Sequence, residues 1–317
     1  MFKPAARRPY FRYAATYLAL TVGLVWAVCL AYLINYDAAV TTLGELTLSN
    51  PIVVLVLHSP ALAAIGILLA YDGPRALLNF LRTLIPRRRD WIWLPTLAAI
   101  MLAYVFAVRF GCQLVGIPVP ADPMTPTAMF VGFVQLLWRE VGMVAICVGW
   151  FGFFLPLMHK WTRSHIWSGI ATGGGIALFV APGNAFSSFD LAIAWPLYAT
   201  QLIILSITMS LLLARMKGNV LFFLVPFWVS ASGSLWRMYH FAAPTQLVQI
   251  TLLSLLAVTL YCVVRRSGLP ELHTFPEYLE AEYTSRMGAV LPGKGNRSQE
   301  VGTLVQAGQR IVAGGAL

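Results

Sequence analysis

Arg139 and Glu140 are the residues most able to take part in chemistry, because they lie side by side within a long apolar stretch. An ionisable side chain inside a membrane-spanning segment is costly and usually serves a function. Neighbouring residues on a helix point about 100° apart, so these two side chains cannot simply pair with each other. We expect each to meet a partner on another helix. An ion pair or hydrogen bond that holds helices together is favoured over a contact with a substrate or a partner protein.

The histidines and cysteines do not have the spacing of a metal site. The chain has five histidines and four cysteines, with no His-x-x-x-His or His-Glu-x-x-His arrangement and no paired cysteines. We therefore predict no metal and no other cofactor. His58 stands alone in an apolar run and is interpreted as a packing residue. The cysteines are interpreted as apolar packing residues as well.

Membrane-spanning helices are the elements that must position these residues. Of the 317 residues, 59% are hydrophobic and only 11% are charged, and the mean hydropathy is +0.74, which excludes an ordinary soluble domain. A helix needs about 20 apolar residues to cross the hydrocarbon core. We predict an all-α, polytopic transmembrane helical bundle with about eight spans, at residues 13–34, 51–71, 91–108, 128–157, 165–180, 191–214, 220–235 and 247–264.

The basic residues predict the orientation, because short cytoplasmic loops are enriched in Lys and Arg. Such residues cluster before the first predicted span and after the second, fourth, sixth and eighth. We expect a bacterial inner-membrane protein with both termini in the cytoplasm. Residues 1–264 would form the transmembrane domain, and residues 265–317 a cytoplasmic tail that is partly disordered or bound to a partner. The net charge of +10 predicts contact with anionic membrane lipids rather than with nucleic acid.

Residues 75–85 have the pattern of an amphipathic helix at the membrane surface. Arg75, Asn79 and Arg82 follow one another at helical spacing, and leucines and Ile85 occupy the positions between and after them. Trp91 follows this segment, and tryptophan is suited to the boundary between lipid head groups and acyl chains. The segment is therefore expected to lie along the membrane and lead into the third span.

The sequence Gly-Trp-Phe-Gly-Phe-Phe-Leu-Pro at residues 149–156 resembles the first motif of the CPBP family. These are CAAX-processing and bacteriocin-processing intramembrane proteases related to the type II prenyl endopeptidase. The family commonly carries Glu-Glu-x-Gly-Trp-Arg-Gly-Phe-Leu-Leu-Pro here, so Ile146, Cys147 and Phe151 stand where it has two acids and an arginine. Residues 179–182 resemble the second motif, with Val180 in place of histidine. Residues 218–232 resemble the third, with Phe227 or the residue after it in place of histidine.

The resemblance implies a CPBP-like fold that has lost the groups thought to bind a metal or activate water. A buried water becomes a useful nucleophile only when a base or a metal lowers its pKa. The favoured function is that of a non-catalytic scaffold or subunit that binds a transmembrane partner or lipid, with Arg139, Glu140 and Trp150 as the expected binding residues. The alternative is an active intramembrane endopeptidase with displaced catalytic residues, of which Glu140 is the first candidate.

Overall fold

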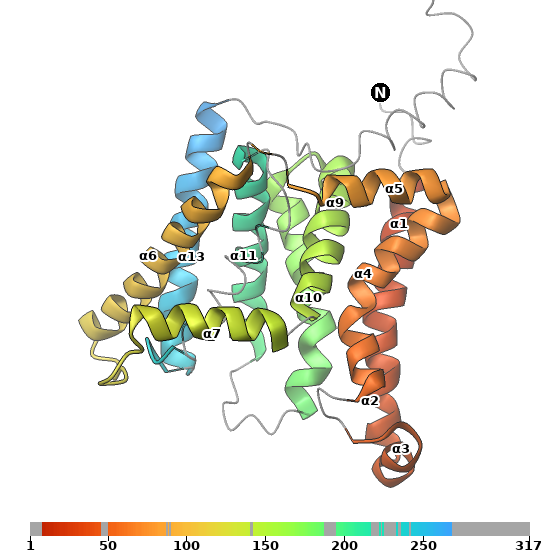
Figure 1. The fold of residues 1–317 in the computed structure, drawn as a ribbon, viewed down its shortest axis with the longest axis horizontal. Coiled ribbons are helices and arrows are strands. Elements are labelled where there is room, and N and C mark those ends of the chain that lie inside the picture. Colours follow the sequence, from red (N-terminus) through yellow and green to blue (C-terminus); the bar gives the residue numbers. More distant parts are fainter. Residues whose placement is uncertain are drawn as a thin grey trace, which may run out of the picture. The chain divides into compact units, whose positions relative to one another are not determined.

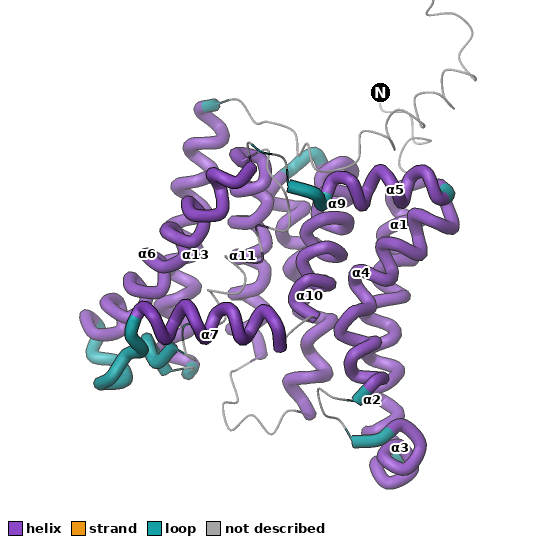
Figure 2. The backbone as a smooth tube through the Cα atoms, viewed as in Figure 1, coloured by secondary structure: helices purple, strands orange, loops and turns teal. Residues whose placement is uncertain are grey.

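The computed structural model describes residues 8–45, 50–86, 88, 90–139, 142–186, 195–216, 222, 224, 233, 236–240 and 242–267. Within these ranges all regular structure is helical and no strand occurs, as Figure 2 shows. The prediction of an all-α chain is thereby confirmed for the described part. The predicted span at 220–235 lies almost wholly outside it. The predicted tail lies outside it from residue 268 onward.

In the part of the chain that the structure describes, six helical segments are long and apolar enough to cross a membrane. They are Tyr10–Ile34, Pro51–Asp72, Asp90–Leu114, Val144–Thr162, Trp195–Arg215 and Ala243–Arg266. Five of them match predicted spans closely, and the fourth matches the second half of one. Their lengths and composition are compatible with a membrane protein.

Residues 8–83 form two long helical segments and two short helices, whose labels Figure 1 gives. Helix α1 (Arg8–Leu18), the π-helical segment η2 (Ala19–Gly23) and α2 (Leu24–Ile34) follow one another without a break, and α3 (Tyr36–Leu43) is short. Helix α4 (Pro51–Asp72) begins where the Asn50 side chain accepts a hydrogen bond from the Ile52 amide at 2.8 Å. It ends at Gly73, whose φ of +83° favours glycine, and α5 (Pro74–Thr83) follows at once.

Polar contacts hold the start of α1 against the end of α4. The Tyr13 hydroxyl donates a hydrogen bond to the Asp72 carboxylate at 2.7 Å, and the hydroxyls of Thr16 and Tyr71 lie 2.9 Å apart. The Arg12 guanidinium lies 4.2 Å from the centre of the Tyr71 ring, a cation–π contact. These contacts fix the end of the bundle from which α5 departs.

The fourth predicted span, 128–157, is wrong as a single element. Helix α7 (Pro126–Arg139) ends at Arg139, and a second helical run starts at Gly142. This run consists of α8 (Gly142–Ile146), the π-helical η4 (Cys147–Phe154) and α9 (Leu155–Thr162). At 14 residues, α7 is too short to cross about 30 Å of hydrocarbon. Arg139 therefore lies at a helix end rather than inside a span, which fits the high cost of charge in hydrocarbon.

Small residues bring α10 (His165–Phe186) and α11 (Trp195–Met216) into close contact. A Cβ atom on Gly169 would lie 2.5 Å from Ile207 Cα, and one on Gly173 would lie 2.4 Å from Ile203 Cα. The two glycines are four residues apart and face backbone, the arrangement that lets membrane helices approach closely. Although α10 has 22 residues, it is not one of the six segments that have both the length and the hydropathy expected of a span.

Among the remaining described helices, α13 packs on α11. The short helix η3 (Asp90–Ile92) leads into α6 (Trp93–Leu114), and α13 (Ala243–Arg266) packs against both α11 and α6. The Arg109 guanidinium of α6 donates hydrogen bonds of 3.0 Å to the carbonyls of Met238 and Pro120, which ties two connecting segments to the end of this helix.

Candidate functional site

The segment that resembles a protease motif forms the most completely buried part of the described chain. All eight residues of η4, Cys147–Phe154, are buried, and the segment is π-helical. A π-helical stretch inside an α-helix often marks a functional position. The segment is also the part of the sequence that carries the clearest family resemblance, so we take it as the candidate site.

Aromatic side chains from three elements surround Trp150, and a fourth element contacts the same segment. Its ring centre lies 5.1 Å from that of Tyr17 in α1, 5.2 Å from Phe154 and 6.1 Å from Phe179 in α10, all edge to face. Tyr17 also stacks on Phe154 with ring centres 5.0 Å apart. On the other side, Phe80 of α5 meets a neighbouring η4 ring edge to face. Edge-to-face and stacked arrangements are favourable for aromatic pairs, so these contacts stabilise the packing of η4 against its neighbours.

Two glycines permit this close packing. A Cβ atom on Gly149 would lie 2.3 Å from the Pro60 carbonyl carbon of α4, and one on Gly175 would lie 2.6 Å from the Trp150 ring. Real Cβ atoms do not approach backbone so closely, because the overlap is strongly repulsive. The glycines of the motif region therefore serve close contact between these elements.

The positions that correspond to the family's acids and arginine hold buried apolar side chains. Ile146, Cys147 and Phe151 are all buried, and Val180 in α10 is half-buried. Phe227 lies outside the described residues. Within the described ranges, no group of three or more His, Cys, Asp or Glu side chains could hold a metal ion. The Trp150 Nε1 and the Tyr17 hydroxyl have no hydrogen-bond partner among these residues. Neither group is a base that could activate water at neutral pH.

The expected charged pair is only partly visible. Arg139 is the last residue of α7, and its side chain is not described; Glu140 lies outside the described residues. The predicted role of both residues in binding therefore stays a prediction. Trp150 itself is fully buried. Its observed contacts are those of a core residue, and its predicted role in binding a partner also stays a prediction.

Sequence reasoning missed a pair of buried histidines. His159 in α9 and His165 in α10 are stacked with ring centres 4.3 Å apart, and both are buried. The His165 Nδ1 and the Ser210 hydroxyl of α11 form a hydrogen bond of 3.1 Å, and the Ser168 hydroxyl donates to the His165 carbonyl. The two histidines and Ser210 connect α9, α10 and α11. This contact could not be predicted from the sequence, because it depends on which helices pack against each other.

A chain of buried glutamines was missed as well. Gln246 Nε2 donates to Gln201 Oε1 at 3.2 Å, and Gln201 Nε2 donates to Gln249 Oε1 at 3.3 Å, so the chain joins α13 to α11. In the adjoining loop, burial raises the pKa of the Tyr239 phenol, while a hydrogen bond with Gln249 lowers it. The signal in the sequence is the pair of glutamines three residues apart in an otherwise apolar helix, which places both on one face.

The glutamine chain leads to the first prediction. Gln201→Ala should destabilise the folded protein by about 1 kcal/mol, because Gln246 and Gln249 each lose a buried partner and membrane hydrogen bonds are of this order. The free energy of unfolding in mixed micelles measures the effect. Thr200→Ala is the matched control, because the Thr200 hydroxyl is exposed and bonds only to the Pro196 carbonyl of its own helix. Equal losses in the two variants would contradict a specific role for the glutamine chain.

In comparison with known proteins, no protein-family model matches the chain, and no curated protein matches it.

Proposed function

We propose that this chain is a non-catalytic, CPBP-like integral membrane protein that acts as a scaffold or subunit and binds a transmembrane partner or lipid within a larger membrane complex. One observation carries the proposal. Buried apolar side chains stand at the positions where the family motif has two acids and an arginine, and Cys147–Phe154 is packed into an aromatic core. In the part of this site that the structure describes, apolar side chains stand in place of the base and the metal ligands that hydrolysis of a peptide bond requires.

The contact between two motif segments supports the CPBP-like part of the proposal. Trp150 of the first motif and Phe179 of the second lie 6.1 Å apart between ring centres, on different elements. A protease of this kind needs its motifs to meet in order to assemble one site. Here they meet through aromatic rings, as expected for a retained scaffold in which the polar groups have been replaced.

Uneven burial of the candidate spans supports the binding of partners or lipid. In the most apolar window of Val144–Thr162, 78% of the residues are buried, compared with 17% in that of Ala243–Arg266. The outer helices therefore present large apolar side chains, such as Phe106 and Phe110 on α6 and Leu255 and Val258 on α13. In a bilayer these surfaces meet acyl chains or the helices of other membrane proteins.

The finer topology belongs to the same proposal. We place the protein in a bacterial inner membrane with about eight spans. These are the six apolar segments together with α10 and residues 220–235. Both termini are cytoplasmic, because the basic residues lie at the corresponding ends. Labels after Arg88, after Lys160 and in the C-terminal tail should all be inaccessible from the periplasm, and accessibility at any of them would overturn this topology.

The function is tested by purification in a gentle detergent, followed by identification of co-purifying proteins, a cleavage assay with membrane peptides, and metal analysis. We expect a membrane protein in near-stoichiometric amount, no cleavage and no stoichiometric transition metal. A metal located among the helices that carry Ile146, Cys147 and Val180 would contradict the proposal.

Glu140→Gln separates the proposed scaffold from a peptidase with displaced catalytic groups. The substitution keeps the shape of the side chain and removes its charge. If Glu140 holds helices or a partner, the variant should reduce the folded yield or release the partner, and Glu140→Ala should do so more strongly, because breaking a buried charge pair costs roughly 3 to 5 kcal/mol. Normal abundance and partner retention together with loss of a measurable cleavage activity would instead identify an active peptidase.

A further inference from the structure

The surface of α5 is divided into three sectors along its length. Ala76 and Phe80, four residues apart, are buried. On the opposite side, Leu78 and Leu81 are exposed, although leucine on a soluble protein would normally face the core. Arg75 and Arg82, which are also exposed, lie beside the leucines. At about 1.5 Å per residue, the two arginines are on the same side of the helix and about 10 Å apart along its axis.

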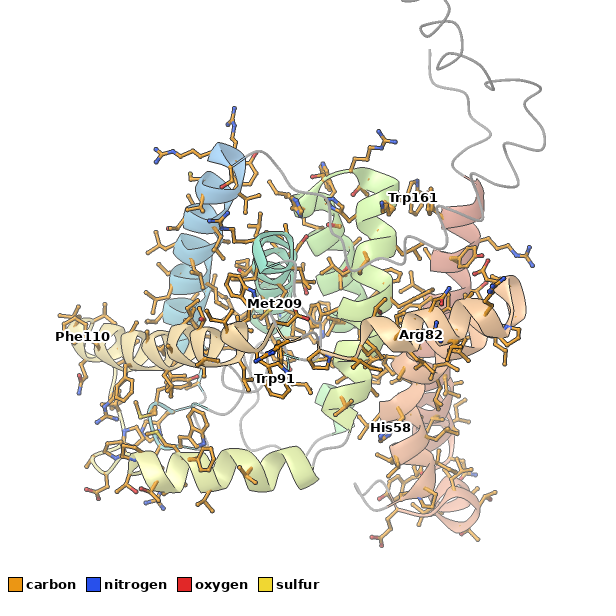
Figure 3. All side chains as sticks on the ribbon, turned by 45° about the horizontal axis from the view of Figure 1, so that its top comes forward. His58, Arg82, Trp91, Phe110, Trp161 and Met209 are labelled. Atoms are coloured by element: carbon orange, nitrogen blue, oxygen red, sulfur yellow. The ribbon has the colours of Figure 1, made fainter. Side chains whose placement is uncertain are left out.

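The buried sector fixes α5 against the core, so its exposed face has a defined direction. Phe80 meets Phe153 of η4 edge to face, with ring centres 6.3 Å apart. Pro74 occupies the first turn of α5 directly after the Gly73 turn, which sets where the helix begins. The leucine sector and the arginine sector therefore face outward side by side. Figure 3 shows Arg82 on this helix.

The residues that follow α5 have the composition of a membrane boundary. Arg88 is exposed, and Trp91 in the next helical segment is exposed too. Tryptophan and arginine are both typical of the head-group level, where a ring or an aliphatic stem contacts acyl chains while a polar group meets phosphate. Exposed leucines beside exposed arginines on one helix have the same dual character. A free inorganic anion would leave the leucines exposed to water, and a purely apolar ligand would leave the arginines without a partner.

We propose that the exposed face of α5 is a binding site for anionic phospholipids, in which Arg75 and Arg82 contact the phosphate groups while Leu78 and Leu81 lie against the acyl chains. Neither arginine has an ion-pair partner among the residues that the structure describes. The guanidinium groups are therefore available for phosphate, which they bind with two parallel hydrogen bonds. This inference concerns lipid at one helix and does not depend on whether the protein is catalytic.

The test uses the full-length protein in a mild nonionic detergent and follows thermal unfolding by tryptophan fluorescence. Dioleoyl phosphatidylglycerol is the probe, dioleoyl phosphatidylcholine tests for acyl chains alone, and inorganic phosphate tests for a free-anion site. Phosphatidylglycerol should raise Tm at lower concentration than phosphatidylcholine, and inorganic phosphate should not raise it. In the double variant R75Q/R82Q the apparent affinity for phosphatidylglycerol should fall about tenfold or more, because each arginine near an anionic surface contributes about fivefold.

The matched control is R265Q/R266Q, which removes two exposed arginines from the end of α13 and should keep the affinity within about twofold. An unchanged Tm in phosphatidylcholine shows that a variant is folded. Undiminished phosphatidylglycerol binding by folded R75Q/R82Q would overturn the proposal, and so would equal losses in both pairs, which would indicate general charge attraction. Stabilisation by inorganic phosphate that is lost in R75Q/R82Q would identify a free-anion site instead. An acidic protein released by R75Q/R82Q without any change in lipid affinity would identify a protein interface.

Discussion

Gly173→Ala should destabilise the folded protein by about 2 kcal/mol or more, whereas Gly174→Ala should leave its stability unchanged or slightly increased. The two glycines are neighbours in α10, yet their surroundings differ. A Cβ on Gly173 would lie 2.4 Å from Ile203 Cα and 2.7 Å from the Leu202 carbonyl oxygen of α11. These are backbone atoms that cannot move without shifting a helix, so the added methyl group would separate α10 from α11. A Cβ on Gly174 meets nothing within 4 Å.

The effect should be large because membrane helices associate mainly through close packing. The hydrophobic effect does not drive them together, since lipid chains are as apolar as the helix surfaces. The free energy of unfolding in mixed micelles, measured for both variants, gives the comparison. Replacing Gly174 with alanine favours the helix by at most about 1 kcal/mol, so this control variant should be as stable as the parent or slightly more stable. Similar values for Gly173→Ala and Gly174→Ala would show that α10 and α11 are not held as closely as the structure has them.

Most of the helices could be predicted from the sequence, because a run of about 20 apolar residues is a sufficient signal for a span. The prediction 51–71 corresponds to Pro51–Asp72, and 247–264 falls within Ala243–Arg266. The division of 128–157 into α7 and the helical run from Gly142 was missed, because apolar residues continue on both sides of the break. The charged pair at 139–140 was the available signal, and we interpreted it as a feature inside a span.

The buried polar contacts could not have been predicted in the same way. His165 meets Ser210, and Gln201 meets Gln246, across pairs more than 40 residues apart in the chain. Hydropathy locates a helix but does not state which helix is its neighbour, so contacts between helices are invisible to it. For α5 the helix was predicted correctly, but Ala76 and Phe80 are buried while Leu78 and Leu81 are exposed. Because exposed leucines carry no penalty in lipid, hydropathy alone does not tell which apolar residues of such a helix face inward.

Trp150 lies at the centre of an aromatic core and is also an expected binding residue, so its contribution to stability must be separated from its proposed role in binding. Trp150→Ala should destabilise the protein by about 3 to 5 kcal/mol, since it leaves a cavity among Tyr17, Phe154 and Phe179. Folded yield after detergent extraction and the free energy of unfolding measure this loss. Trp167→Ala is the matched control, because Trp167 is 63% exposed and its removal should cost little.

Trp150→Phe distinguishes packing from binding. Phenylalanine keeps most of the ring contacts, and it removes an indole N–H that has no hydrogen-bond partner among the described residues. If Trp150 serves the core alone, this variant should lose no more than about 1.5 kcal/mol, as for other conservative apolar exchanges, and should retain any co-purifying protein. A Trp150→Phe variant that is as stable as the parent but releases its partner would mean that the indole N–H donates to that partner. The motif would then be a binding element, and the aromatic core around it would be the support that holds the indole in place.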